Sequence, residues 1–149
     1  MDYLIRSCLI SDLPAIVALC QKHADYERAL YDKAGKEDLL CEAIFTGNPK
    51  LYCYVVEIDG RVAGYFSYTI DFSTWDAGNF IYLDCLFIDT PFRGAGIGMR
   101  VFEKLKQIAK QQGCINIQWQ TPESNEAAIR FYKRIGGIAT AKARFVLQT

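Results

Sequence analysis

The chain has 149 residues, of which 51% are hydrophobic and 23% are charged. This length and composition predict one globular domain that covers residues 1–149. Seventeen basic residues balance seventeen acidic ones, so bulk charge gives no reason to expect nucleic acid or an anionic membrane as a partner.

Targeting signals and metal-binding patterns are not recognised in the sequence. No apolar run approaches the length of a membrane span, and the first residues lack the basic and apolar regions of a signal peptide, so we expect a cytoplasmic protein. The six cysteines are scattered without a C-x-x-C pair, which indicates reduced thiols and not a disulfide framework. His23 is the only histidine, and no metal site is expected.

The first half of the chain predicts two helices and three strands. Ser11-Asp12-Leu13-Pro14 is typical of a helix start, with a capping side chain and an early proline. Asp59-Gly60 predicts a hairpin turn. The expected elements are a strand at 3–9, the helix from residue 11, a helix at 37–45, and strands at 51–58 and 61–70.

The second half alternates strands and helices. Residues 79–88 form the most apolar strand, and Ile97, Val101 and Leu105 then recur at helical spacing before Gly113 ends that helix. The pattern predicts an α/β fold with a mixed, mostly antiparallel central sheet flanked by helices. The other expected elements are a turn at 71–78, a strand at 115–119, a helix that opens at 124–126 and closes at 136–137, and a last strand at 138–147.

The most informative segment is the loop at residues 93–98, Arg-Gly-Ala-Gly-Ile-Gly, between the apolar strand and the next helix. Its bare backbone and the first turn of the helix suit a pyrophosphate. A dinucleotide fingerprint fails because Met99 takes the place of its last glycine, and a Walker A loop fails because no Lys-Ser/Thr follows Gly98. The spacing Arg-x-x-Gly-x-Gly fits, and a glycine-rich turn without a ligand is the alternative.

A second informative segment runs from Asn125 to Gly137 and contains the run Phe-Tyr-Lys-Arg at residues 131–134. Asn125 and Tyr132 are seven positions apart. On a helix they therefore lie two turns apart on one face and can reach one extended ligand. The alternative is a plain amphipathic helix with Phe131 buried.

Together the two segments resemble the GNAT superfamily of N-acetyltransferases. Residues 93–98 resemble the loop that binds the acetyl-CoA pyrophosphate, and residues 125–137 resemble the family's Asn-x-x-Ala-x-x-Phe-Tyr stretch. The resemblance implies acetyl-CoA as co-substrate, a fourth and a fifth strand splayed apart to hold it, and the Leu86 amide as an oxyanion donor. The cofactor-binding residues that it implies are Leu86, Phe87, Ile88, Arg93, Gly94, Ala95, Gly96, Ile97, Gly98, Met99, Asn125, Ala128 and Tyr132.

A closer resemblance is to the diamine (spermidine/spermine) and thialysine N-acetyltransferase branch. Tyr26-Glu27 after the first helix, Trp75, Tyr82-Leu83-Asp84 and residues 131–134 resemble residues of that branch. The resemblance implies that the two residues of Tyr26-Glu27 lie on the acceptor side of the site. It also gives the only reason to expect a homodimer.

The chain departs from this branch at several charged positions. Asp84 is one methylene shorter than the branch's Glu, and Cys85 stands where an Asp is usual. After Glu126 the chain has no acidic residue, and Lys142 and Arg144 lie near the last expected strand. A polycation would meet positive charge there, which argues against spermidine and spermine.

Acetyl transfer to an alkylamine needs a neutral amine, although a free alkylamine has a pKa near about 10 and is protonated at neutral pH. Asp84 is the expected proton acceptor, because it stands in an otherwise apolar strand where an unpaired carboxylate is costly. A structural Asp bonded to backbone amides is the alternative. By resemblance, the Tyr132 hydroxyl serves the leaving thiolate. His23 is expected to pack and not to act as a base.

The sequence therefore predicts an acetyl-CoA-dependent N-acetyltransferase that acts on a primary amine of a small molecule by direct attack in a ternary complex. The expected acceptor is a diamine, a polyamine or a lysine-like amino acid. An acetyltransferase for peptide or protein amines and a non-catalytic CoA-binding domain are the alternatives. The expected catalytic residues are Tyr132 and Asp84, and the expected substrate-binding residues are Tyr26, Glu27, Trp75, Asp84 and Trp119.

Overall fold

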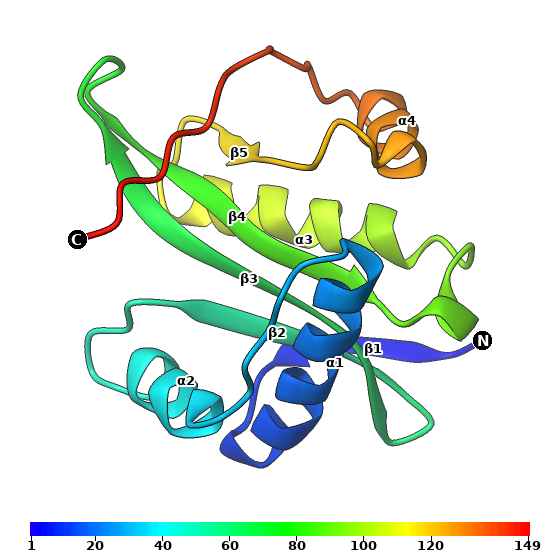
Figure 1. Cartoon of the computed structure of the whole chain (residues 1–149). Helices are drawn as coiled ribbons and strands as arrows, with labels where there is room; N and C mark the ends of the chain where they lie inside the picture. Colours follow the sequence, from blue (N-terminus) through cyan, green and yellow to red (C-terminus); the bar gives the residue numbers. More distant parts are fainter.

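A computed structural model describes all of residues 1–149 (Figure 1). A five-stranded sheet with the order β1-β2-β3-β4-β5 confirms the predicted mixed, mostly antiparallel α/β fold, since only β5 runs parallel to its neighbour β4. Two 3-10 helices lie at Ile10–Asp12 and Thr90–Phe92. The other elements are β1 (Tyr3–Ser7), α1 (Leu13–Tyr26), α2 (Lys36–Ile44), β2 (Tyr52–Ile58), β3 (Arg61–Ser73), β4 (Gly78–Ile88), α3 (Ile97–Gln111), β5 (Ile117–Trp119) and α4 (Glu126–Arg134).

Helices cover both faces of the sheet. α1 and α2 lie on one face and α3 on the other, while α4 follows β5 near the sheet edge (Figure 1). Val101 and Leu105 of α3 share one core with Phe66, and Ile16 of α1 shares a second core with Val55. Burial of one such side chain contributes roughly 1.5–3 kcal/mol, so the two cores hold α1 and α3 firmly on opposite faces.

The strand β4 contains a bulge at Asp84. Tyr68 of β3 pairs with Leu83 and Ser67 pairs with Cys85, so Asp84 is the extra residue on β4. A bulge reverses the alternation of side chains along a strand. Accordingly, Leu83 belongs to the core on the α3 side, whereas Cys85 packs against the core on the α1 side.

The expected divergence of β4 and β5 is confirmed. The two strands pair only from Ile81 with Ile117 to Leu83 with Trp119. Beyond Leu83, β4 continues to Ile88, while the chain after Trp119 turns away toward α4 (Figure 1). The slot between them is bordered on one side by Asp84 and by the last four residues of β4, which pair with β3 alone.

Several boundaries differ from the sequence prediction. β1 ends at Ser7 because the chain enters a 3-10 helix at Ile10, and β5 begins at Ile117 and not at residue 115. The predicted turn at 71–78 shrinks to residues 74–77, since β3 and β4 continue as a two-stranded ribbon. This ribbon is largely exposed, so no apolar alternation marks it in the sequence.

The predicted last strand at 138–147 is wrong. These residues form no strand, and the side chains of Ile138 and Phe145 are more than 90% exposed. Alternating apolar residues form a strand only where a sheet edge accepts their backbone groups. The segment crosses the molecule beyond β5 without pairing to it (Figure 1).

Candidate active site

The loop at residues 93–98 joins the end of β4 to the start of α3. Gly94 and Gly96 have φ angles of +81° and +76°, a left-handed conformation that glycine adopts without strain. Nothing lies within 4 Å of the positions where their Cβ atoms would stand. Gly96 is the N-cap of α3, and no side chain caps this helix. The first N–H groups of α3 thus border open space, which fits a pyrophosphate.

Gly98 is a glycine for another reason. A Cβ atom at this position would lie 2.9 Å from Cζ of Phe131, so the bare backbone lets α4 approach α3 closely. The next residue, Tyr132, then lies beside Phe102 of α3, with 5.8 Å between the ring centroids. The sequence motif therefore combines two loop glycines that leave room for a ligand with one helix glycine that packs α4.

Arg93, the first residue of the motif, ties three elements together. Its Nε donates a hydrogen bond to the backbone oxygen of Ile88 at 2.7 Å. Its guanidinium lies over the rings of Tyr26 and Phe87, at 4.8 and 5.1 Å from the ring centroids. The end of β4, the end of α1 and the loop are thus held against each other by one side chain.

Tyr132 lies in an aromatic cluster on the β5 side of the slot. Its ring meets Trp119 edge-on at 5.3 Å and Phe102 at 5.8 Å between centroids. Burial raises the pKa of the Tyr132 phenol, and the negative charge of Glu27 raises it further. The phenol therefore keeps its proton at neutral pH and is available as a hydrogen-bond donor. Trp119 also packs under Gly137.

Asp84 lies at the point where β4 leaves β5, directly after Leu83. Contrary to the expectation of a carboxylate inside an apolar strand, its side chain is exposed. The bulge removes Asp84 from the alternation that would bury it. Its only side-chain contact of hydrogen-bond type is with the thiol of Cys85 at 3.7 Å. The carboxylate is thus free to meet a ligand at the mouth of the slot.

The end of α1 faces the start of α4 across a cavity of about 560 Å³. The Tyr26 hydroxyl donates a hydrogen bond to Oδ1 of Asn125 at 3.4 Å. The same Asn125 oxygen caps α4 by accepting from the backbone N–H of Ala128. The cavity is lined by Tyr26, Glu27, Arg28, Pro122, Ser124, Asn125, Glu126, Ala127 and Arg130.

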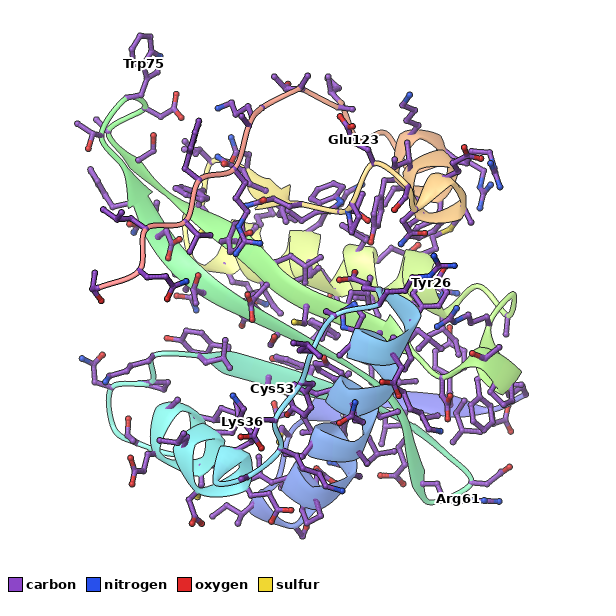
Figure 2. The ribbon with its side chains drawn as sticks, in the orientation of Figure 1. Tyr26, Lys36, Cys53, Arg61, Trp75 and Glu123 are labelled. Atoms are coloured by element: carbon purple, nitrogen blue, oxygen red, sulfur yellow. The ribbon has the colours of Figure 1, made fainter.

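The structure gathers most of the predicted site residues but not all of them. Trp75 lies at the tip of the β3–β4 ribbon, 96% exposed, at the opposite end of the molecule from Tyr26 (Figure 2). Sequence reasoning also missed the hydrogen bonds that join Glu27, His23 and the buried Tyr65. The spacing of His23 and Glu27, four residues apart on a helix, is the signal that could have found this pair.

Comparison with known proteins establishes the family. Residues 16–137 match the family model described as "Acetyltransferase (GNAT) family". The chain therefore belongs to the GNAT family and is an N-acetyltransferase, and acetyl-CoA is the acetyl donor of this family.

No helix has the length and apolar character needed to cross a bilayer. No group of three or more His, Cys, Asp or Glu side chains is arranged to hold a metal ion.

Relatives with curated names are similar over most of the chain. A thialysine N-epsilon-acetyltransferase of Mus musculus is 29% identical over 89% of this chain and 82% of its own length. A spermidine/spermine N(1)-acetyltransferase-like protein of Homo sapiens is 28% identical over 93% of this chain, which corresponds to 21% of that protein.

Solved structures confirm the fold. A possible acetyltransferase from Clostridium difficile 630 has a TM-score of 0.83 at 19% identity and covers 99% of this chain and 97% of its own. An aminoglycoside N-acetyltransferase in complex with CoA has a TM-score of 0.82 at 16% identity and covers 99% of this chain and 95% of its own.

Proposed function

We propose that this N-acetyltransferase acetylates a primary amine of a small molecule, a diamine, a polyamine or a lysine-like amino acid, by direct attack in a ternary complex. One observation carries the proposal. The slot between β4 and β5 has an exposed carboxylate at its mouth, Asp84, a protonated phenol on its far side, Tyr132, and the open N-terminus of α3 at its end.

Acetyl-CoA supplies a thioester whose carbonyl carbon accepts the amine. The first N–H groups of α3 and the loop at 93–98 hold its pyrophosphate. The edge of β4 at residues 86–88, which β5 leaves unpaired, aligns the pantetheine arm, and the Leu86 amide stabilises the developing oxyanion. Met99 and Asn125 border the same path.

Asp84 receives the acceptor's ammonium and passes one proton to water, which leaves a neutral amine. The amine nitrogen then forms the new N–C bond while the C–S bond breaks, and the proton that the nitrogen loses as it becomes an amide passes to water or to the departing thiolate. Tyr132 stabilises the departing thiolate by a hydrogen bond or gives it the phenolic proton. A phenol is a weaker acid than a thiol by about 1.5 units in reference pKa, and burial of Tyr132 increases this gap, so we favour hydrogen bonding.

The charges around the cavity favour a lysine-like amino acid within this acceptor class. Glu27 can hold an ammonium group, while Arg28 and Arg130 line the same cavity and can hold a carboxylate. Glu126 lies 3.8 Å from Arg130 and offsets part of its charge. An acceptor with an amine and a carboxylate matches both signs of charge, whereas the ammonium groups of a polyamine would also meet the arginines. The name of the Mus musculus relative is consistent with this choice.

The test is thiol release from acetyl-CoA with a panel of acceptors. The panel contains lysine, thialysine, a short diamine, spermidine and a peptide with a free amino terminus. We expect the highest kcat/KM for an acceptor that carries both an amine and a carboxylate. Turnover of the peptide alone would favour a protein acetyltransferase. Binding of acetyl-CoA without release for any amine would indicate a non-catalytic CoA-binding domain.

A further inference from the structure

A line of hydrogen-bonded side chains runs from the core under α1 to the proposed active site. Most of these side chains have no role in the proposed acetyl transfer. Cys20, His23 and Glu27 lie on one face of α1 and its C-terminal end, spaced three and four residues apart. The Tyr65 hydroxyl lies 3.3 Å from the Cys20 sulfur and 3.4 Å from Nδ1 of His23. Nε2 of His23 lies 3.2 Å from Oε1 of Glu27.

The position of each proton along this line follows from burial. Tyr65 is 3% exposed, and burial raises the pKa of its phenol far above the ordinary value, so the hydroxyl keeps its proton. The Cys20 thiol donates to the hydroxyl oxygen. The O–H of Tyr65 donates in turn to Nδ1 of His23, because an imidazole nitrogen is a better acceptor than the nearby sulfur of Cys85.

With Nδ1 acting as an acceptor, the neutral imidazole of His23 carries its hydrogen on Nε2. That N–H points at Glu27 and donates to its carboxylate. The ring has little freedom to turn away, since it stacks on Phe87 at 5.1 Å between centroids and its side chain is 19% exposed. The core thus fixes the direction of a donor that meets a carboxylate near the protein surface.

The carboxylate held in this way belongs to the active site. The charge of Glu27 raises the pKa of Tyr132, and Glu27 lines the cavity between α1 and α4. A single surface carboxylate on a flexible side chain would lose conformational freedom on binding an ammonium group. A donor already in place removes part of that cost and leaves the second carboxylate oxygen for the ligand.

We infer that His23 is a positioning residue of this enzyme, whose neutral imidazole, fixed by Tyr65, orients the Glu27 carboxylate toward the cationic amine of the acceptor. The inference rests on the proposed function. The side chains in contact with His23 are Glu27 at the C-terminal end of α1, Tyr65 of β3 and Phe87 of β4, and Arg93 lies over the Phe87 ring.

The first experiment reads the tautomer of His23 directly. Because His23 is the only histidine in the chain, ¹⁵N labelling of histidine gives two ring-nitrogen signals without overlap. We expect the Nε2–H tautomer in the wild-type protein at neutral pH, and loss of this preference in Tyr65→Phe. The Nδ1–H tautomer, or the averaged signals of a freely exposed imidazole, would overturn the inference without any measurement of turnover.

The second experiment asks whether His23 acts through Glu27. We expect His23→Leu to raise the acceptor KM roughly tenfold, as for loss of one hydrogen bond to a charged group, with the KM for acetyl-CoA unchanged. His23→Gln, which keeps an N–H donor, should restore most of the affinity for the acceptor. Gln21→Leu removes another i,i+4 hydrogen bond of α1, that to Asp25, and serves as the matched control.

The double variant His23→Leu/Glu27→Gln separates positioning from packing. If His23 acts through Glu27, the double variant has the same acceptor KM as Glu27→Gln alone. Independent effects of the two changes, or a His23→Leu effect confined to thermal stability, would overturn the inference. If the wild-type protein releases no thiol with any amine, the proposed function itself fails. If the wild-type enzyme is active but the acceptor KM is unchanged in His23→Leu, only the inference about His23 fails.

Discussion

At the scale of single residues, the two groups proposed to act on the amine and on the departing thiolate lie in opposite surroundings. Tyr132 lies among Trp119, Phe102 and Phe131, and this burial keeps its phenol protonated. Asp84 stands exposed on a bulge, where water can take a proton from it. A buried phenol that stays protonated can donate a hydrogen bond to the departing thiolate, and a solvated carboxylate can pass the proton of the amine to water.

Tyr132→Phe removes only the hydroxyl and keeps the aromatic packing. We expect kcat to fall by roughly 10²–10⁴-fold, the usual range for such groups, with little change in acetyl-CoA binding or melting temperature. Because the pKa of Tyr132 is raised, its ionisation should cause no loss of wild-type kcat below about pH 10. Tyr54→Phe, on β2 two strands away from β4, is the control. A Tyr132→Phe enzyme with wild-type kcat, when chemistry is rate-limiting, would reduce Tyr132 to a packing residue.

Asp84→Asn keeps the size of the side chain and removes its charge. The acceptor amine then loses its route to the neutral form, so kcat/KM should fall. The acidic limb of the pH profile of kcat/KM should move to higher pH. Stability should change by no more than about 0.5 kcal/mol, because the side chain is exposed. The exposed Asp71 of β3 offers the control Asp71→Asn. An unaltered pH–rate profile would mean that deprotonation runs through water or another residue.

At the scale of elements, the site depends on how α3 and α4 meet the open edge of β4. The helix α3 presents an uncapped N-terminus because Gly96 takes a left-handed conformation directly before it. The helix α4 reaches this place because Gly98 leaves room for Phe131. Asn125 caps α4 and accepts from Tyr26 of α1, so the ends of three helices converge on the slot.

The loop conformation makes Gly96→Asn a sharper probe than a bulky apolar substitution. Asn tolerates a positive φ, whereas a β-branched residue would strain the backbone at +76° and confuse folding with binding. We expect the KM for acetyl-CoA to rise roughly tenfold, equal to about 1.4 kcal/mol of lost binding, with the fold intact. Gly35→Asn is the matched control, since Gly35 is the N-cap of α2 at φ +72° with open space around it. Equal acetyl-CoA affinity in the two variants would exclude pyrophosphate binding at this loop.

At the scale of the whole molecule, a partly buried ion network joins the first strand to the rest of the sheet. Arg6 of β1 donates to Asp12 at 2.7 Å and to Glu57 of β2 at 2.7 Å. Asp12 also accepts from the backbone N–H of Leu9, and its side chain is 8% exposed. The hydrogen bonds from Arg6 lower the pKa of Asp12 below its ordinary value.

Because the pKa of Asp12 is lowered in the folded protein, its contribution to stability is fully present above the unfolded-state pKa and is lost as pH falls through the folded pKa. Asp12→Asn should therefore lower the free energy of unfolding by about 3 kcal/mol at neutral pH, since it leaves Arg6 partly unpaired. The difference from wild type should shrink in acid. Urea unfolding at several pH values measures this, and Glu103→Gln, which breaks an exposed pair with Arg100, should change stability by less than about 1 kcal/mol. A constant difference at all pH values would contradict this account.

The sequence by itself determined the fold class, the family and the two segments that border the slot. These features are local, because the spacing of Arg93, Gly96 and Gly98 and the two-turn separation of Asn125 and Tyr132 can be recognised without knowing what lies nearby. The apolar strand at 79–88 and the hairpin turn at Asp59-Gly60 are local in the same sense, and both are confirmed.

Only the tertiary structure decided which residues meet and which stand alone. The bulge that exposes Asp84 depends on pairing with β3, and the need for glycine at position 98 depends on Phe131, which lies thirty-three positions later in the chain. The segment 138–147 alternates like a strand but pairs with no edge. His23 joins the buried Tyr65 to Glu27 only because the fold brings β3 against α1. Pairing, close approach and desolvation arise between distant segments, so no local pattern records them.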